Sequence, residues 1–244
     1  MKAMILAAGL GTRLYPLTKD IPKCMVEING KPLIEHQIKW LRDNGITEIA
    51  INLHYLPEKI KEYLSDGSKL GVKLTYSFEE KLMGTAGGVK KIKDFFDEPF
   101  LVFYGDEFTD LDLNELTAYH QSKNAFLTIC IRKKPAGSKA SNIIKLNENK
   151  RIMGFVEKPS EELVRILNLP NLANCGIYIC NQEILEKLPE STFYDFGRDV
   201  FPDLVKQKEV YGFIIPDQYY WCEIGRLEKY QKYKPEIERR IKSR

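Results

Sequence analysis

The chain has 244 residues, of which 43% are hydrophobic and 29% charged, and its formal net charge is +3 at pH 7. This composition is typical of a globular protein with a sizeable core, and it excludes disordered and fibrous classes. The net charge is too small to indicate nucleic-acid binding, and the apolar stretches fall short of the ~20 residues that span a bilayer. Five cysteines without a C-x-x-C pair and three histidines favour buried thiols in a reducing cytoplasm and argue against a zinc site.

Expected strands and helices alternate from the start of the chain. Residues 3–8 predict a strand, and residues 32–45 predict a helix because Ile34, Ile38 and Leu41 share one helical face and Gly45 can end it. The other expected strands lie at 48–53, 72–78, 100–104, 125–132, 142–146, 151–157, 175–180 and 210–215. The other expected helices lie at 57–64, 84–96, 112–122 and 181–188, and from about residue 227.

This order predicts an α/β fold. Alternating elements favour a three-layer α/β/α sandwich, Rossmann-like, around a mainly parallel mixed sheet with ligand-binding loops at the carboxyl ends of its strands. We find no linker rich in Pro, Gly or Ser and no repeat, so we expect one domain over residues 1–244.

The stretch "LAAGLGTRLYPLT" at 6–18 follows the first expected strand and contains Gly9 and Gly11. Its small residues allow backbone N–H groups to approach phosphate oxygens. The dinucleotide fingerprint lacks its third glycine, and the Walker pattern is absent because Pro32 follows the lysine of "NGKP". Arg13 and Lys23 suit a triphosphate, since a guanidinium fork and an ammonium point charge can share its oxygens. A tight structural turn explains the glycines equally well when the loop is taken alone.

Together with "IPKCMVEINGKPLI", this stretch resembles the signature G-x-G-T-R-x-x-P-x-T…P-K-P-M of the sugar-1-phosphate nucleotidyltransferases, also called NDP-sugar pyrophosphorylases. Further motifs follow in the family's order, so the resemblance covers nearly the whole chain. They are "EEKLMGTAGGV" (79–89), "FYGDEF" (103–108), "GFVEKP" (154–159), "NCGIYI" (174–179), "FGRDVFPDL" (196–204) and "YWCEIG" (220–225).

The resemblance implies the nucleotide-diphospho-sugar transferase fold, with a nucleotide-binding lobe at about 1–125. A sugar-phosphate-binding lobe with the C-terminal helix would occupy about 126–244. It also implies an EC 2.7.7-type reaction of nucleotide-sugar and polysaccharide biosynthesis. A sugar 1-phosphate oxygen attacks the α-phosphorus of an NTP, and pyrophosphate leaves without an enzyme-bound intermediate. Such catalysis consists mainly of positioning and charge neutralisation.

The resemblance also implies roles for individual residues. The catalytic residues would be Arg13 at the β- and γ-phosphates, Lys23 at the α-phosphate, Asp106 at a metal ion and Lys158 at the sugar phosphate. The implied nucleotide-binding residues are Leu6, Ala7, Ala8, Gly9, Gly11, Thr12, Arg13, Lys23, Glu79, Gly84, Thr85, Ala86 and Asp106. The implied substrate-binding residues are Asn142, Glu157, Lys158, Asn174 and Gly176. The implied cofactor is Mg²⁺, held by Asp106 and Glu223, because this ion prefers carboxylate and phosphate oxygens.

Four carboxylates lie close together in "YGDEFTDLD" at 104–112, but only Asp106 is expected to bind metal. It follows the apolar strand directly, at the carboxyl end where α/β folds bind ligands. Glu107 should point to the other side of an extended chain. Asp110 and Asp112 should begin the next helix, with Asp112 as its N-cap. An EF-hand does not fit, because the loop lacks its glycine and its closing glutamate.

Three positions depart from the family pattern. Cys24 replaces a proline beside Lys23, and we expect little effect on the chemistry. Glu223 replaces an aspartate, so it can bind metal only if its strand lies slightly further back. Asn142 stands where the family often has glycine. Asparagine tolerates positive φ but adds a side chain, which bears on the choice of substrate.

The "GTAGG" turn is similar to that of mannose- or heptose-phosphate guanylyltransferases, which favours GTP. Other stretches are similar to muramate-1-phosphate uridylyltransferases and to cytidylyltransferases, so UTP, CTP and another phosphomonoester stay open. Two other classes also stay open: a non-catalytic nucleotide-binding module and a dinucleotide-dependent oxidoreductase. We expect a cytoplasmic protein without nucleic-acid or membrane partners, and a homodimer or homotetramer is left open.

Overall fold

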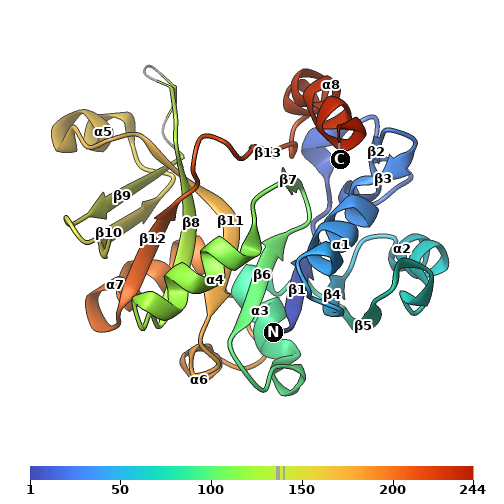
Figure 1. Cartoon of the computed structure of the whole chain (residues 1–244), viewed down its shortest axis with the longest axis horizontal. Helices are drawn as coiled ribbons and strands as arrows, with labels where there is room; N and C mark the ends of the chain where they lie inside the picture. The colour runs from blue at the N-terminus through green and yellow to red at the C-terminus, as the bar shows by residue number, and fades with distance from the viewer. Residues whose placement is uncertain (136–137, 140, 244) are drawn as a thin grey trace. The chain divides into compact units, whose positions relative to one another are not determined.

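The computed structural model describes residues 1–135, 138–139 and 141–243. The chain forms two compact units, each built from separate stretches of sequence (Figure 1). Unit 1 comprises Met1–Leu82, Val102–Leu111 and Gln218–Arg244, and unit 2 comprises Met83–Leu101 and Asp112–Asp217. The predicted lobe boundary near residue 125 stays a prediction.

Unit 1 contains the neighbouring strands β1, β4 and β5 and most of β6, in the order β6-β1-β4-β5. They are β1 (Ala3–Leu6), β4 (Glu48–Leu53), β5 (Lys73–Phe78) and β6 (Phe100–Tyr104). The parallel pairs β1–β4 and β4–β5 are joined by helices α1 (Leu33–Asp43) and α2 (Pro57–Leu64), as parallel strands require crossover connections. Ile34, Ile38 and Leu41 of α1 are fully buried, which confirms the face predicted from their spacing.

Short elements complete unit 1. They are the 3₁₀ turns η1 (Thr12–Leu14), η2 (Lys23–Met25) and η3 (Ser68–Leu70), the hairpin β2 (Glu27–Ile28) and β3 (Lys31–Pro32), the antiparallel ribbon β7 (Glu107–Thr109) and β13 (Trp221–Glu223), and helix α8 (Leu227–Lys242). Helix α8, red in Figure 1, packs against η1, β2 and β13. A buried cluster that includes Leu14, Phe108, Cys222 and Ile237 holds these elements together.

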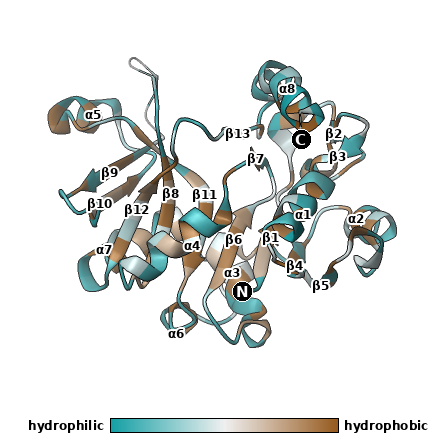
Figure 2. Cartoon of the chain, viewed as in Figure 1, coloured by the Kyte–Doolittle hydropathy of each residue, from teal (hydrophilic) through white to brown (hydrophobic). Residues whose placement is uncertain are grey.

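Unit 2 contains a sheet in the order β12-β8-β11 and a separate antiparallel hairpin of β9 and β10. The strands are β8 (Leu127–Lys133), β9 (Asn142–Leu146), β10 (Ile152–Glu157), β11 (Leu172–Cys180) and β12 (Val210–Ile214). The helices are α3 (Gly84–Lys91), η4 (Lys93–Phe95), α4 (Leu113–Ser122), α5 (Glu161–Leu167), α6 (Ile184–Lys187), the π-helix η5 (Phe196–Val200) and α7 (Phe201–Gln207). Figure 2 shows the hydrophobic residues concentrated in the strands.

The predicted α/β class with a mixed, mostly parallel sheet is confirmed. Asp112 is confirmed as the N-cap of α4, since its Oδ1 accepts a hydrogen bond of 2.8 Å from Asn114 N. The helix predicted over 84–96 is wrong at its end. The helix stops at Lys91, and the buried Phe96 stacks on Phe100 with ring centroids 4.0 Å apart.

All five cysteines are buried and free. In the described ranges, no helix combines the length and the apolar character that crossing a membrane requires.

Candidate active site

The glycine loop after β1 leaves room around Gly9 and brings Lys23 close to Gly11. Gly11 has a φ of 70°, and a Cβ there would stand 3.2 Å from the Cβ of Lys23. Thr18 fixes this turn by donating a 2.7 Å hydrogen bond to the carbonyl of Gly11. At Gly9, a Cβ would meet no described atom within 4 Å. The loop can therefore accept a ligand at Gly9, while glycine is required at Gly11.

Asn52 connects two predicted nucleotide-binding residues. Its Oδ1 accepts a 2.7 Å hydrogen bond from Ala7 N, and its Nδ2 donates a 2.8 Å hydrogen bond to Glu79 Oε1. Asn52 and Glu79 are 3% and 1% exposed. These buried hydrogen bonds therefore help to hold the backbone at Ala7, where the glycine loop begins. Asn52 was not predicted as a site residue from the sequence. The available signal was an amide side chain near the carboxyl end of the otherwise apolar strand β4.

The two predicted metal ligands, Asp106 and Glu223, lie together in unit 1. They meet at Gly225, where a Cβ would stand 2.5 Å from Asp106 Oδ2, 2.8 Å from Lys23 Nζ and still closer to Glu223 Oε1. This is a cradle that any larger residue at position 225 would fill. No cluster of three or more His, Cys, Asp or Glu side chains suited to a metal occurs among the described residues. Two carboxylates fit a divalent ion that takes its remaining ligands from phosphate and water.

Each of these carboxylates pairs with a lysine. Lys23 Nζ forms an ion pair with Asp106 Oδ2, and Lys229 Nζ from the first turn of α8 forms one with Glu223 Oε2. The other oxygen, Glu223 Oε1, accepts a 3.0 Å hydrogen bond from Gly225 N. Lys23 was predicted from the sequence, whereas Lys229 and Gly225 were not. The glycine of "YWCEIG" was the available signal.

Glu107 has different surroundings from its neighbour Asp106. It is 4% exposed, and its Oε2 accepts a 3.1 Å hydrogen bond from Trp221 Nε1. Burial, reinforced by the negative charge of Asp106, raises the pKa of Glu107 well above its usual value. The adjacent acids therefore have separate environments and separate partners.

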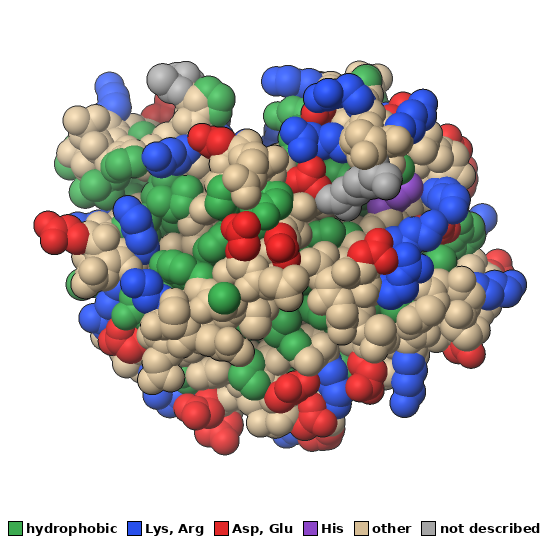
Figure 3. Space-filling model, in the orientation of Figure 1, with side chains coloured by type: hydrophobic (Ala, Val, Ile, Leu, Met, Phe, Trp, Pro, Cys, Tyr) green, Lys and Arg blue, Asp and Glu red, His purple; other side chains and the backbone are tan. Residues whose placement is uncertain are grey.

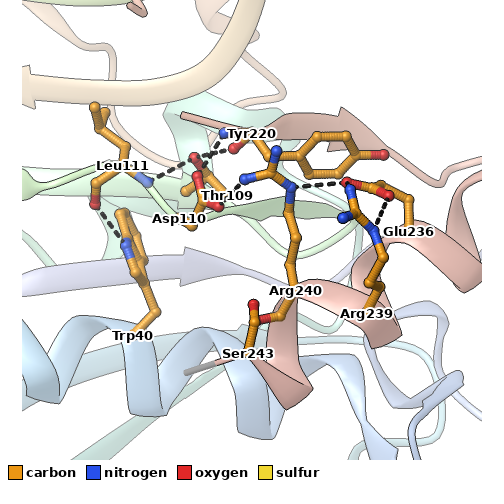
Figure 4. Close-up of polar contacts among 9 residues, drawn as sticks. All are labelled: Trp40, Thr109, Asp110, Leu111, Tyr220, Glu236, Arg239, Arg240 and Ser243. Carbon is orange, nitrogen blue, oxygen red and sulfur yellow. Dashed lines mark hydrogen bonds and ion pairs between the residues drawn. The ribbon is translucent and has the colours of Figure 1, made fainter. Parts of the chain in front are cut away.

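Asp110 anchors the β7–β13 ribbon that carries Glu223 (Figure 4). Its Oδ1 accepts a hydrogen bond from Tyr220 N, and its Oδ2 forms a 2.6 Å ion pair with Arg240 Nη1. Arg240 also lies over the ring of Tyr220, 4.9 Å from its centroid. The prediction that Asp110 begins the following helix is wrong, because α4 starts only at Leu113. Tyr220 and Arg240 draw Asp110 toward the ribbon and α8 instead.

Unit 2 brings the predicted substrate-binding residues together. Asn142 faces Glu157 across the β9–β10 hairpin, and its Nδ2 donates to Glu157 Oε2. Its Oδ1 accepts a 3.0 Å hydrogen bond from Asn174 N, and Asn174 Oδ1 accepts one of 3.0 Å from Gly176 N. Lys158 follows directly with a φ of 49°. Asn142, Glu157, Asn174 and Gly176 form a connected polar cluster, in which Asn142 lies in an extended strand.

Asp195 links this cluster to the turn at Thr85. Thr85 Oγ1 donates a 3.0 Å hydrogen bond to Asp195 Oδ2 and accepts one of 2.9 Å from Phe196 N. A Cβ on Gly197 would stand 2.9 Å from Glu157 Oε2, so the glycine leaves room for the Glu157 carboxylate in its present position. Burial, and then the negative charge of Asp195, raise the pKa of Glu157. Gly197 belongs to the motif at 196–204, but the sequence pattern indicated no role for Asp195 or Gly197.

The sequence profile of the Nucleotidyl transferase family matches residues 2–240. The chain belongs to this family. A UTP–glucose-1-phosphate uridylyltransferase of Synechocystis is 38% identical to this chain, with 100% of the chain and 65% of the relative covered. A probable mannose-1-phosphate guanylyltransferase of Oryza sativa is 34% identical, with 94% of the chain and 63% of the relative covered. The chain thus spans somewhat less than two thirds of these relatives' lengths.

Among solved structures, HddC from Yersinia pseudotuberculosis superposes on this chain with a TM-score of 0.80 at 26% identity. The match covers 97% of the chain and 99% of HddC. The complex of HddC with GMP-PN gives a TM-score of 0.78. The predicted resemblance to sugar-1-phosphate nucleotidyltransferases is therefore confirmed at the level of the family and the fold.

Proposed function

We propose that the chain transfers a nucleotidyl group from an NTP to a sugar 1-phosphate. A phosphate oxygen of the sugar 1-phosphate forms a bond to the α-phosphorus, and the bond from that phosphorus to the bridging oxygen of the β-phosphate breaks. The products are an NDP-sugar and pyrophosphate. The observation that carries this proposal is the meeting of Asp106, Glu223 and Lys23 at Gly225, because carboxylates beside a lysine suit a metal-bound phosphate.

In unit 1 we assign the triphosphate to the glycine loop. Arg13 is exposed and can hold the β- and γ-phosphates, while Lys23 can hold the α-phosphate once it releases Asp106. Asp106 and Glu223 would hold Mg²⁺, which when bound neutralises phosphate charge. Positioning and charge neutralisation are the main requirements of such a transfer, because nucleophile and electrophile are both anionic.

In unit 2 we assign the sugar 1-phosphate to the cluster around Glu157. Lys158 would bind the sugar phosphate, and Glu157 and Asn174 would bind sugar hydroxyl groups. The hydrogen bonds from Asn142 to Glu157 and to Asn174 support this assignment, since they fix both groups in one arrangement. The predicted roles of Gly84, Thr85 and Ala86 toward the nucleotide stay part of the proposal.

We propose GTP as the first nucleotide to test. The guanylyltransferase relative and the solved complex of HddC with GMP-PN support this choice. UTP is the second candidate, because the uridylyltransferase relative has the higher identity, 38%. The five buried free thiols fit a reducing compartment such as the cytoplasm. Assembly into a homo-oligomer stays a prediction.

One assay tests the proposed reaction. The chain is incubated with Mg²⁺, each of GTP, UTP, CTP and dTTP, and a panel of sugar 1-phosphates, and the released pyrophosphate is measured. We expect pyrophosphate only when both substrates are present, with the matching NDP-sugar detected by mass spectrometry. Tight nucleotide binding without pyrophosphate from any pair would contradict the proposal and favour a non-catalytic module.

A further inference from the structure

A cavity of about 250 Å³ lies at the start of helix α8, and two arginines line it. Its lining consists of Arg13, Arg226, Leu227 and Glu228. Arg13 belongs to η1, which packs against α8, so two distant parts of the sequence share this cavity. Arg13 already has a place in the proposed triphosphate site, whereas Arg226 has no assigned role.

Neither arginine has a polar partner among the residues that the structure describes. Within residues 1–135, 138–139 and 141–243, no hydrogen bond or ion pair involves the side chain of Arg13 or Arg226. Arg239 and Arg240, on the same helix, both pair with Glu236. Two unpaired cations on one cavity repel each other, and an anion that enters the cavity removes this repulsion.

We propose that Arg226 binds the pyrophosphate part of the nucleotide together with Arg13. The proposal rests on the proposed function, because it places a second guanidinium at the β- and γ-phosphates and at the pyrophosphate product. Each guanidinium can engage phosphate oxygens with two parallel N–H groups. A pyrophosphate offers two phosphoryl groups, one for each fork, whereas inorganic phosphate offers only one.

Glu228 gives the proposal a second consequence. Glu228 is among the residues that line the same cavity, and in the described part of the chain no ion pair joins it to either arginine. A negative charge at this position opposes a bound pyrophosphate. Removing that charge should therefore tighten binding, while removing the charge of Arg226 should weaken it.

The test is calorimetric titration of inorganic pyrophosphate into the full chain in the presence of Mg²⁺. The variants are R226Q, R226K and E228Q, with K242Q as the matched control. K242Q removes one positive charge from the far end of α8, where Lys and Arg side chains gather over the helix (Figure 3). Melting temperatures show whether each variant keeps its fold.

We expect R226Q to weaken pyrophosphate binding at least ~10-fold, a loss of ~1.4 kcal/mol. R226K should fall between R226Q and the unmodified chain, because it keeps the charge but loses the fork. E228Q should bind more tightly, and K242Q should stay within about twofold. Inorganic phosphate should show a smaller loss in R226Q than pyrophosphate does.

Three results would overturn the assignment of Arg226: pyrophosphate affinity of R226Q within twofold of the unmodified chain, an equal loss in K242Q, or no pyrophosphate binding by the unmodified chain. The proposed function has a separate test. If no NTP and sugar 1-phosphate pair gives turnover while R226Q still loses pyrophosphate affinity, the proposed reaction fails and the anion site stands.

Discussion

The carboxylates of Asp106 and Glu223 both lie beside Gly225, in space that a side chain at position 225 would occupy. A Cβ on Gly225 would stand 2.5 Å from Asp106 Oδ2 and closer still to Glu223 Oε1. Both contacts involve the ends of side chains and not the backbone, so the fold can accept the methyl group of an alanine at position 225. The two carboxylates would have to move away from it and could not keep their present positions. We therefore expect G225A to fold normally and to lose at least ~10-fold in Mg²⁺ affinity.

Equilibrium titration with Mg²⁺ checks this expectation, and the melting temperature reports the fold. The matched control is G154A, where a Cβ would make only an ordinary 3.7 Å contact with Lys145. Unchanged Mg²⁺ affinity in G225A would show that the metal does not bind at this cradle.

Asp110 and Arg240 should be energetically coupled. Replacing Arg240 by methionine leaves the mostly buried carboxylate of Asp110 without its ion pair, at a cost of roughly 1–3 kcal/mol. In the double variant D110N/R240M the uncompensated charge is gone, so the combined loss should be smaller than the sum of the single losses. Urea unfolding of the four proteins measures the coupling, and strict additivity would contradict it.

Glu35 should make the fold sensitive to acid. Burial by itself would raise its pKa, but hydrogen bonds from Lys39, Tyr63 and Lys31 outweigh burial and lower the pKa of Glu35 to about 2. A carboxyl whose pKa is lowered in the folded state stabilises the fold above its unfolded value of 4.5. That stability is lost as the pH falls from 4.5 toward 2.

We therefore expect E35Q to lose about 1–3 kcal/mol at pH 7 and much less near pH 2. Urea unfolding at several pH values measures the difference. E58Q is the control, because Glu58 forms an exposed pair with Lys61 and such pairs contribute little. An E35Q deficit that does not change with pH would argue against this role for the carboxylate.

Glu157 should change the stability of the fold with pH in the opposite direction to Glu35. Burial and the nearby charge of Asp195 raise the pKa of Glu157 above 4.5, so the fold loses stability as the pH rises from 4.5 to the raised value, and the whole loss is present above that value. E157Q should be at least as stable as the unmodified chain at pH 7, with the difference vanishing below pH ~4. Its KM for the sugar 1-phosphate should rise about tenfold. An E157Q variant with a normal KM would remove Glu157 from the sugar site.

Long elements with strong patterns were predictable from the sequence. The apolar run at 100–104 and the spacing of Ile34, Ile38 and Leu41 gave β6 and one face of α1, because burial alone determines these elements. The ribbon of β7 and β13 was not predicted. Each of its strands has three residues, and its pairing joins Trp221 to Thr109 across more than a hundred residues.

Some residues of the candidate site were also predictable from the sequence, and others were not. Asp106 and Lys23 carry type-specific signals, a carboxylate after a buried strand and a lysine after a glycine loop. Asn52, Lys229 and Arg226 were missed because their importance depends on which segments lie beside them. Helix α8, for example, brings Lys229 to Glu223 and Arg226 to the cavity shared with Arg13.

The most direct measurement is the rate of pyrophosphate release by D106N compared with the unmodified chain, using the most active pair of NTP and sugar 1-phosphate. If Asp106 holds the metal at the reacting phosphate, D106N should lose about 100-fold or more in kcat and keep its melting temperature within a few degrees. A D106N variant that folds and releases pyrophosphate at a near-normal rate would contradict this account of the site.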